Sequence, residues 1–242
     1  MIDAQTYLEH IRHEGVRIAD VAAGNLEKDV PSCPGITVAD LLVHTMATCA
    51  FWTGALEQNR FPQGDMPSFG NDPLEAHRRS FDAFVEAAAN RDPDDTTWTW
   101  AGEGKVRFWY RRAAQELAVH RWDFENAVGE TLPIDPTLAV DGVDEFLFVF
   151  GPSTGNPDFP GASTKFGGDG QTIRLEPTDM PEPITFTAQT DRFERTDAEP
   201  DVTARGTASD LLLFLWGRVP PSALEISGDA SLLERWQELV KI

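Results

Sequence analysis

The chain has 242 residues, with 20 Lys and Arg against 40 Asp and Glu, so its formal net charge is −20. A surface this negative repels phosphate backbones and anionic lipids, which excludes nucleic-acid or membrane binding through a basic patch. Hydrophobic residues make up 41% of the chain, enough for a buried core, and two cysteines cannot form a disulfide framework. No apolar run is longer than six residues, Leu211 to Trp216, far too short to span a membrane. We therefore expect a cytoplasmic protein with one large or two small domains.

The first 150 residues have the pattern of a helical domain. Thr37 followed by Asp40 predicts a capping box, Asp72 before Pro73 is a typical helix start, and Gly129 is a typical helix end. Apolar positions recur at helical spacing between these signals. The predicted helices are residues 5–24, 37–59, a helix from 73 onward, 106–128 and 138–150. Helices joined by short and medium loops favour a bundle over residues 1–150.

The composition changes near residue 151. Residues 151–170 are rich in glycine and proline, which predicts a linker or long loop. Beyond it come short runs with strand character, a very apolar helix that we expect Ser209 to cap and Gly217 to end, and a final helix from Ala230. The predicted strands are residues 172–176, 184–188, 201–205 and 224–228. The prediction is an α+β protein, with a small α/β domain over 151–242.

The chain has five histidines, and their positions on the predicted helices differ. His10, His13 and His77 lie off the apolar stripes or among arginines, so we expect them on the surface. His44 shares a mostly apolar helix face with Leu41 and Phe51 and His120 lies on another such face, so both should point inward.

Glu116 lies one helical turn before His120, on the same apolar face. An ionised glutamate in a bundle interior costs several kcal/mol unless a partner compensates it. One solution is a divalent cation held by Glu116, His120 and His44 from a facing helix. The other is a buried Glu–His pair bonded to each other or to Arg112. Three protein ligands would leave a position for water or substrate, and the leading ion is Zn²⁺, with another divalent transition metal as the alternative. Asp123, one turn beyond His120, either orients an imidazole or is a surface or capping carboxylate.

Neither cysteine has the surroundings of a reactive thiol. Cys49 lies on a predicted helix and should pack as a small apolar residue, and Cys33 lies in a proline-flanked loop without an adjacent basic residue. Arg218 follows the apolar helix that ends at Gly217. It either complements the helix C-terminus or binds a carboxylate of a ligand.

Three segments together resemble the mycothiol-dependent maleylpyruvate isomerase family over nearly the whole chain. They are residues 33–44 (CPGITVADLLVH), 116–123 (ELAVHRWD) and 216–218 (WGR). One departure is Ile36, where many relatives carry an aromatic residue. The resemblance implies a DinB-like four-helix bundle followed by a small domain similar to sterol carrier proteins (SCP2-like).

The resemblance also implies a metal triad at His44, Glu116 and His120 and a functional arginine at Arg218. It further implies mycothiol as a thiol cofactor that takes the place of a protein cysteine. The metal would hold the mycothiol sulfur as a thiolate, which adds to the cis double bond of maleylpyruvate and leaves after rotation to the trans isomer. Arg218 would bind a substrate carboxylate. The same thiolate could instead stay attached to a small electrophile, which gives a mycothiol S-transferase. A non-enzymatic, DinB-like binding protein is a third reading.

Overall fold

A computed structural model describes residues 2–65, 68–150, 168–190 and 192–239. Backbone contacts divide the chain into two compact units, Met1–Leu132 and Pro133–Ile242. Among the helices of the described residues, none is long and apolar enough to cross a membrane.

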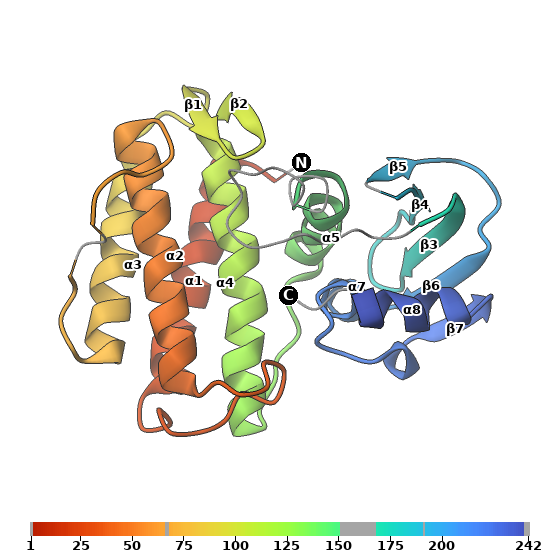
Figure 1. The fold of residues 1–242 in the computed structure, drawn as a ribbon, viewed down its shortest axis with the longest axis horizontal. Coiled ribbons are helices and arrows are strands. Elements are labelled where there is room, and N and C mark those ends of the chain that lie inside the picture. Colours follow the sequence, from red (N-terminus) through yellow and green to blue (C-terminus); the bar gives the residue numbers. More distant parts are fainter. Residues whose placement is uncertain (1, 66–67, 151–167, 191, 240–242) are drawn as a thin grey trace. The chain divides into compact units, whose positions relative to one another are not determined.

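The first unit is a bundle of four helices (Figure 1). They are α1 (Ala4–Ala22), α2 (Val38–Gln58), α3 (Pro73–Ala89) and α4 (Arg107–Val128). Each helix packs on two neighbours, and the order around the bundle is α1, α3, α2, α4. The apolar faces of the helices meet in a core that includes Ile18, Leu42, Phe84 and Leu117, all fully buried. The predicted four-helix bundle is confirmed.

The ends of the bundle helices follow the local signals in the sequence. The Thr37 hydroxyl and the Asp40 carboxylate form the capping box of α2, and the Asp72 carboxylate accepts two backbone N–H groups at the start of α3. Gly129 ends α4 with a left-handed φ of 77°. Local hydrogen bonding therefore sets where α2, α3 and α4 begin or end.

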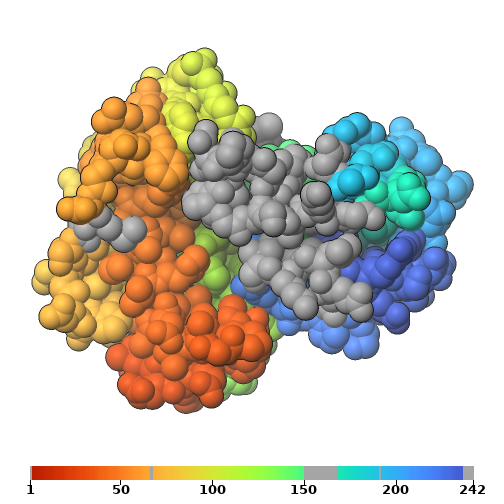
Figure 2. Space-filling view, viewed as in Figure 1, coloured from red at the N-terminus to blue at the C-terminus, as the bar shows by residue number. Residues whose placement is uncertain are grey.

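A β-hairpin that the sequence did not predict precedes α4. Strands β1 (Thr96–Thr99) and β2 (Gly102–Lys105) pair antiparallel, and the Trp109 indole donates to the Trp98 carbonyl at 3.1 Å. Trp98, Trp100 and Phe108 pack their rings around Trp109. Figure 2 shows this hairpin at one end of the first unit and the loop before α2 at the other. The contacts of these aromatic rings stabilise the hairpin, which has no clear strand pattern in its sequence.

The second unit is a small α/β domain, as predicted. Its elements are α5 (Pro136–Glu145), a π-helical turn (Phe146–Phe150), β3 (Gln171–Pro177), β4 (Ile184–Ala188), β5 (Phe193–Arg195), β6 (Val202–Gly206), α7 (Ala208–Leu215), a 3₁₀ turn (Pro221–Ala223), β7 (Glu225–Gly228) and α8 (Ser231–Leu239). The sheet order is β5-β4-β3-β6-β7, parallel only between β3 and β6. The predicted strands are confirmed to within a residue at each end, and β5 was not predicted.

Trp236 of α8 lies at the centre of the second core. Its indole ring contacts Phe186 and Phe193 of the sheet and Phe214 of α7, and its N–H donates to the Leu215 carbonyl at 3.2 Å. One side chain thus joins the sheet to the helices that cover it.

Two sequence expectations about this unit need correction. The predicted boundary at residue 150 lies too late, because α5 packs on α7 and the Ser209 hydroxyl accepts the Ile134 N–H at 3.0 Å. Thr207, not Ser209, caps α7 by accepting the Asp210 N–H. Most of the predicted linker, residues 151–167, lies outside the described residues.

Candidate metal centre

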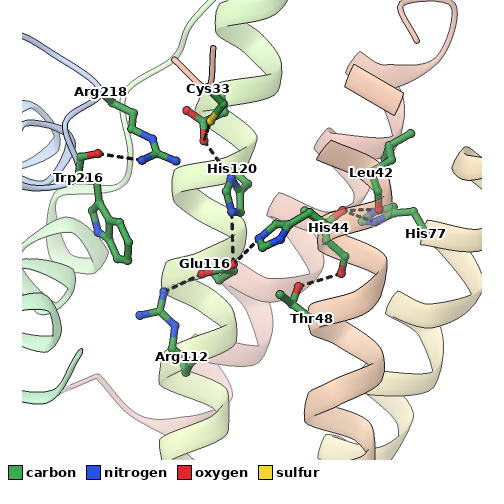
Figure 3. Close-up of polar contacts among 12 residues, drawn as sticks. Cys33, Leu42, His44, Thr48, His77, Arg112, Glu116, His120, Trp216 and Arg218 are labelled. Carbon is green, nitrogen blue, oxygen red and sulfur yellow. Dashed lines mark hydrogen bonds and ion pairs between the residues drawn. The ribbon is translucent and has the colours of Figure 1, made fainter. Parts of the chain in front are cut away.

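The three residues predicted as metal ligands come together on two neighbouring helices of the first unit (Figure 3). His44 projects from α2, and Glu116 and His120 project from α4 one turn apart. The His44 Nε2 lies 3.0 Å from the Glu116 Oε1, and the His120 Nε2 lies 3.3 Å from the same oxygen. The donor atoms of the three residues all lie within 4.8 Å of one another. Helix α4 supplies two of the three residues, and the packing of α2 against α4 brings in the third.

Two of the three ligand-to-ligand distances are compatible with a tetrahedral metal site. In a tetrahedral site with bonds of about 2.0–2.1 Å, neighbouring ligand atoms lie about 3.3 Å apart. The two contacts to the Glu116 Oε1, at 3.0 and 3.3 Å, are close to that edge length. Two imidazoles and one carboxylate are also a donor set that zinc uses when it keeps a fourth position open.

The orientation of His44 differs from the prediction. Its side chain is 48% exposed, whereas that of Glu116 is 15% exposed and His120 is buried. The fully buried side of α2 carries Leu41, Leu42 and Thr45, so His44 lies at the edge of the bundle. The inward pointing predicted for His44 is therefore wrong, and the cluster lies at the surface of the first unit, within reach of a small ligand.

Electrostatics favour an ionised carboxylate in the cluster. Burial by itself would raise the pKa of Glu116, but hydrogen bonds from His120 and His44 and the charges of His120 and Arg112 hold it well below its usual range. Burial by itself would lower the pKa of His120, but hydrogen bonds to Asp123 and Glu116 and their charges raise it to about 9. A metal ion and the proton of His120 would therefore compete for the same nitrogen.

Asp123 hydrogen-bonds the His120 ring nitrogen that does not face Glu116, which is one of the roles that the sequence suggested. The His120 Nδ1 lies 2.9 Å from the Asp123 Oδ2, and Asp123 is fully buried. This contact holds a proton on Nδ1, so Nε2 is the nitrogen that a metal could bind once it has lost its own proton. The Cys33 thiol, from the loop before α2, lies 3.8 Å from the same Asp123 oxygen, a contact that the sequence did not indicate.

Arg112 lies closer to the cluster than the sequence suggested. It was predicted at the edge of the α4 face, but its side chain is only 2% exposed and its guanidinium lies 3.3 Å from the Glu116 Oε2. The predicted metal-free alternative, a Glu–His pair bonded to each other or to Arg112, uses these same contacts. The geometry brings together both sets of partners that the sequence allowed.

His77 is the clearest error among the histidines. It was predicted on the surface, but it is 0% exposed, its Nδ1 lies 3.0 Å from the Thr45 hydroxyl, and its ring stacks on Phe81. Burial lowers the pKa of His77 to about 4, although the Gly15 carbonyl partly opposes this. His13 is exposed and His10 is half-buried. A neutral His77 thus belongs to the packing between α2 and α3.

The two remaining candidates, Cys49 and Arg218, each make contacts within their own unit. Cys49 is fully buried, and burial raises the pKa of its thiol far above the usual value. Arg218 in the second unit is half-buried, its backbone N–H bonds the Leu213 carbonyl, and its guanidinium donates to the Trp216 carbonyl at 2.8 Å. These contacts place a cation at the C-terminus of α7, and they leave the carboxylate-binding alternative open.

The chain is a two-unit protein, a helical bundle with a His–Glu–His cluster followed in sequence by a small α/β unit. Two family models match the chain, the mycothiol maleylpyruvate isomerase N-terminal domain over residues 8–125 and the MDMPI C-terminal domain over residues 137–235. The chain belongs to the mycothiol maleylpyruvate isomerase family, which confirms the resemblance of its sequence motifs.

Two solved structures share the fold. One is a crystal structure of a mycothiol-dependent maleylpyruvate isomerase, with a TM-score of 0.66 and 12% identity, and 93% of each chain is covered. The other is a crystal structure of a histidine-to-alanine mutant of a mycothiol-dependent maleylpyruvate isomerase, with a TM-score of 0.65, 11% identity and the same coverage. No curated protein matches the chain significantly by sequence.

Proposed function

We propose that this protein is a mycothiol-dependent enzyme that requires a divalent metal, with Zn²⁺ as the proposed ion. In this proposal it isomerises the cis double bond of maleylpyruvate or a related unsaturated acid. The observation that carries the proposal is the convergence of His44, Glu116 and His120 in a chain of this family. The substrate class and the thiol follow the family, and the metal follows the donor set.

The chain itself lacks a convincing nucleophilic thiol. Cys49 is fully buried, and the Cys33 thiol lies 3.8 Å from a carboxylate oxygen of Asp123. A reaction that needs a thiolate would therefore depend on a small thiol brought from outside, which agrees with a mycothiol-dependent family.

The residues of the cluster have distinct tasks in this proposal. His44, Glu116 and His120 would hold the metal, which lowers the pKa of a bound thiol and so supplies a thiolate near neutral pH. Asp123 keeps His120 in the tautomer whose Nε2 can bind a metal. The half-exposed side chain of His44 keeps the cluster open to a small thiol.

Arg218 is proposed as the residue that binds a carboxylate of the substrate. Its guanidinium belongs to a half-buried side chain, and a guanidinium can grip a carboxylate with two hydrogen bonds. In a chain with a net charge of −20, an acidic substrate needs such a local cation.

The test combines metal analysis with a substrate assay. The purified protein should contain one equivalent of metal, and His44→Ala should lose most of it, whereas His13→Ala, which changes an exposed histidine of the same bundle, should keep it. With mycothiol present, maleylpyruvate should convert to its trans isomer, followed by absorbance. A wild-type protein without stoichiometric metal would overturn the metal-dependent proposal.

The assay also separates the other two readings. A stable mycothiol conjugate with a small electrophile, without isomerisation, would identify an S-transferase. Bound ligand without any turnover of either kind would identify a binding protein.

A further inference from the structure

The two carboxylate oxygens of Glu116 have different partners. Oε1 faces the imidazoles of His44 and His120, at 3.0 and 3.3 Å. Oε2 faces the guanidinium of Arg112, at 3.3 Å. Figure 3 shows Arg112 and the two histidines on different sides of the carboxylate. One oxygen is therefore directed at the candidate metal position and the other at a fixed cation.

Arg112 is buried in this position. It lies one turn before Glu116 on α4, and its side chain is only 2% exposed. An exposed pair at this spacing would contribute little and would exchange partners freely. A buried guanidinium keeps a defined direction toward its carboxylate.

We infer that Arg112 is a positioning residue, which occupies the Glu116 Oε2 so that Glu116 binds a metal through Oε1 alone. This inference rests on the proposed metal site. Free carboxylates bind metals through one or two oxygens, and a second oxygen from Glu116 would take the coordination position that an incoming thiol needs. Partners behind a ligand commonly control its geometry in this way.

The alternative is that Arg112 only stabilises the bundle as a buried cation. Arg121 provides a matched comparison, because it is also a buried arginine of α4, paired with Glu14 and Glu125 away from the cluster. Loss of either arginine should destabilise the bundle, but only loss of Arg112 should change how Glu116 binds a metal.

The experiment is zinc K-edge X-ray absorption on the zinc-loaded wild type, Arg112→Met and Arg121→Met. The wild type should show a zinc shell with a single oxygen from Glu116, Arg112→Met should gain one oxygen ligand per zinc, and Arg121→Met should match the wild type. Titration of the Co²⁺-loaded proteins with mycothiol, followed by the thiolate charge-transfer band, should show at least about a tenfold weaker thiol affinity for Arg112→Met alone.

Each outcome bears on a defined claim. An unchanged zinc shell in Arg112→Met, or the same change in Arg121→Met, overturns the inference. A second Glu116 oxygen on zinc in the wild type overturns it too, even if Arg112→Met does not fold. A wild type that binds no zinc refutes the proposed metal site instead, so the two failures are distinguishable.

Discussion

Helix α4 carries two clusters of buried charge on different faces, and they are built in different ways. On the side of α1, Arg121 donates to Glu14 and Glu125 at 2.8 and 2.7 Å, and Arg17 donates to Glu125 at 2.8 Å. On the side of α2, the cluster consists of Arg112, Glu116, His120 and His44. Both clusters compensate carboxylates. In the first, guanidinium groups do so and the exposed His13 lies 3.5 Å from Glu14, whereas in the second two imidazoles meet at one carboxylate oxygen.

The comparison shows that buried charge alone does not identify a functional site. In the α1-facing cluster, guanidinium groups and a backbone N–H of Leu132 satisfy the carboxylates, and guanidinium groups do not bind metals. In the α2-facing cluster, three ligand-type atoms converge on one position and one of their side chains is half exposed. The donor type and its accessibility, rather than burial, distinguish the two.

The largest expected effect is the loss of activity on substitution of Glu116. Glu116→Gln keeps the size of the side chain but removes the anionic ligand, so metal should be lost and kcat/KM should fall at least about 10⁴-fold, or about 5 kcal/mol. Metal content and the isomerase assay measure this. Glu86→Ala, on the exposed face of α3, should leave both unchanged. A Glu116→Gln variant that keeps its metal and its activity would show that the α2-facing cluster, like the α1-facing one, has only a structural role.

Substitution in the α1-facing cluster should affect stability instead. Arg121→Met leaves the Glu14 and Glu125 carboxylates buried without this partner, which should cost about 3–5 kcal/mol of unfolding free energy. Urea denaturation measures the loss. Arg79→Ala removes an exposed ion pair to Glu75 and should cost less than about 1 kcal/mol. Metal content per folded protein should not change in either variant, and a loss of metal in Arg121→Met would contradict the distinction.

The pH response of His77, a buried histidine outside both clusters, extends the comparison. Among the described residues no carboxylate contacts His77, and burial lowers its pKa to about 4 in the fold against 6.5 in the unfolded chain. The unfolded chain therefore binds more protons between these values, so the stability due to a neutral His77 is present above pH 6.5 and is lost as pH falls toward 4.

The size of this loss should reach about 3 kcal/mol. Unfolding free energies of the wild type and His77→Gln, measured in urea from pH 7 to 4, should therefore converge as pH falls. A difference that stays constant over this range would show that His77 does not remain neutral in the fold.

The smallest expected effect concerns the support of His120. Asp123→Asn keeps the shape of the side chain but weakens the hold on the His120 Nδ1 proton, so zinc affinity should fall about 10–100-fold, or about 1–3 kcal/mol. Competition with a chromophoric chelator measures the affinity. An unchanged affinity would assign Asp123 to packing alone.

Much of the architecture could be predicted because it depends on local patterns. The capping box at Thr37, the helix start at Asp72 and the glycine stop at Gly129 act within a few residues of chain, so they appear in the sequence as they do in the fold. The pairing of Glu116 with His120 is also local, because side chains four residues apart share a helix face. The β1–β2 hairpin was missed because its stability comes from tryptophans and phenylalanines brought together by the fold.

The sequence by itself therefore determined the bundle, the strands of the second unit, the family motifs and the three candidate ligands. Only the tertiary structure decided that His44 lies at the edge of the bundle, that His77 is buried, that α5 belongs to the second unit and that Arg112 faces the Glu116 Oε2. The physical reason is that periodicity defines a helix face, whereas the packing of neighbouring helices determines how deeply each residue on that face is buried and which groups it meets.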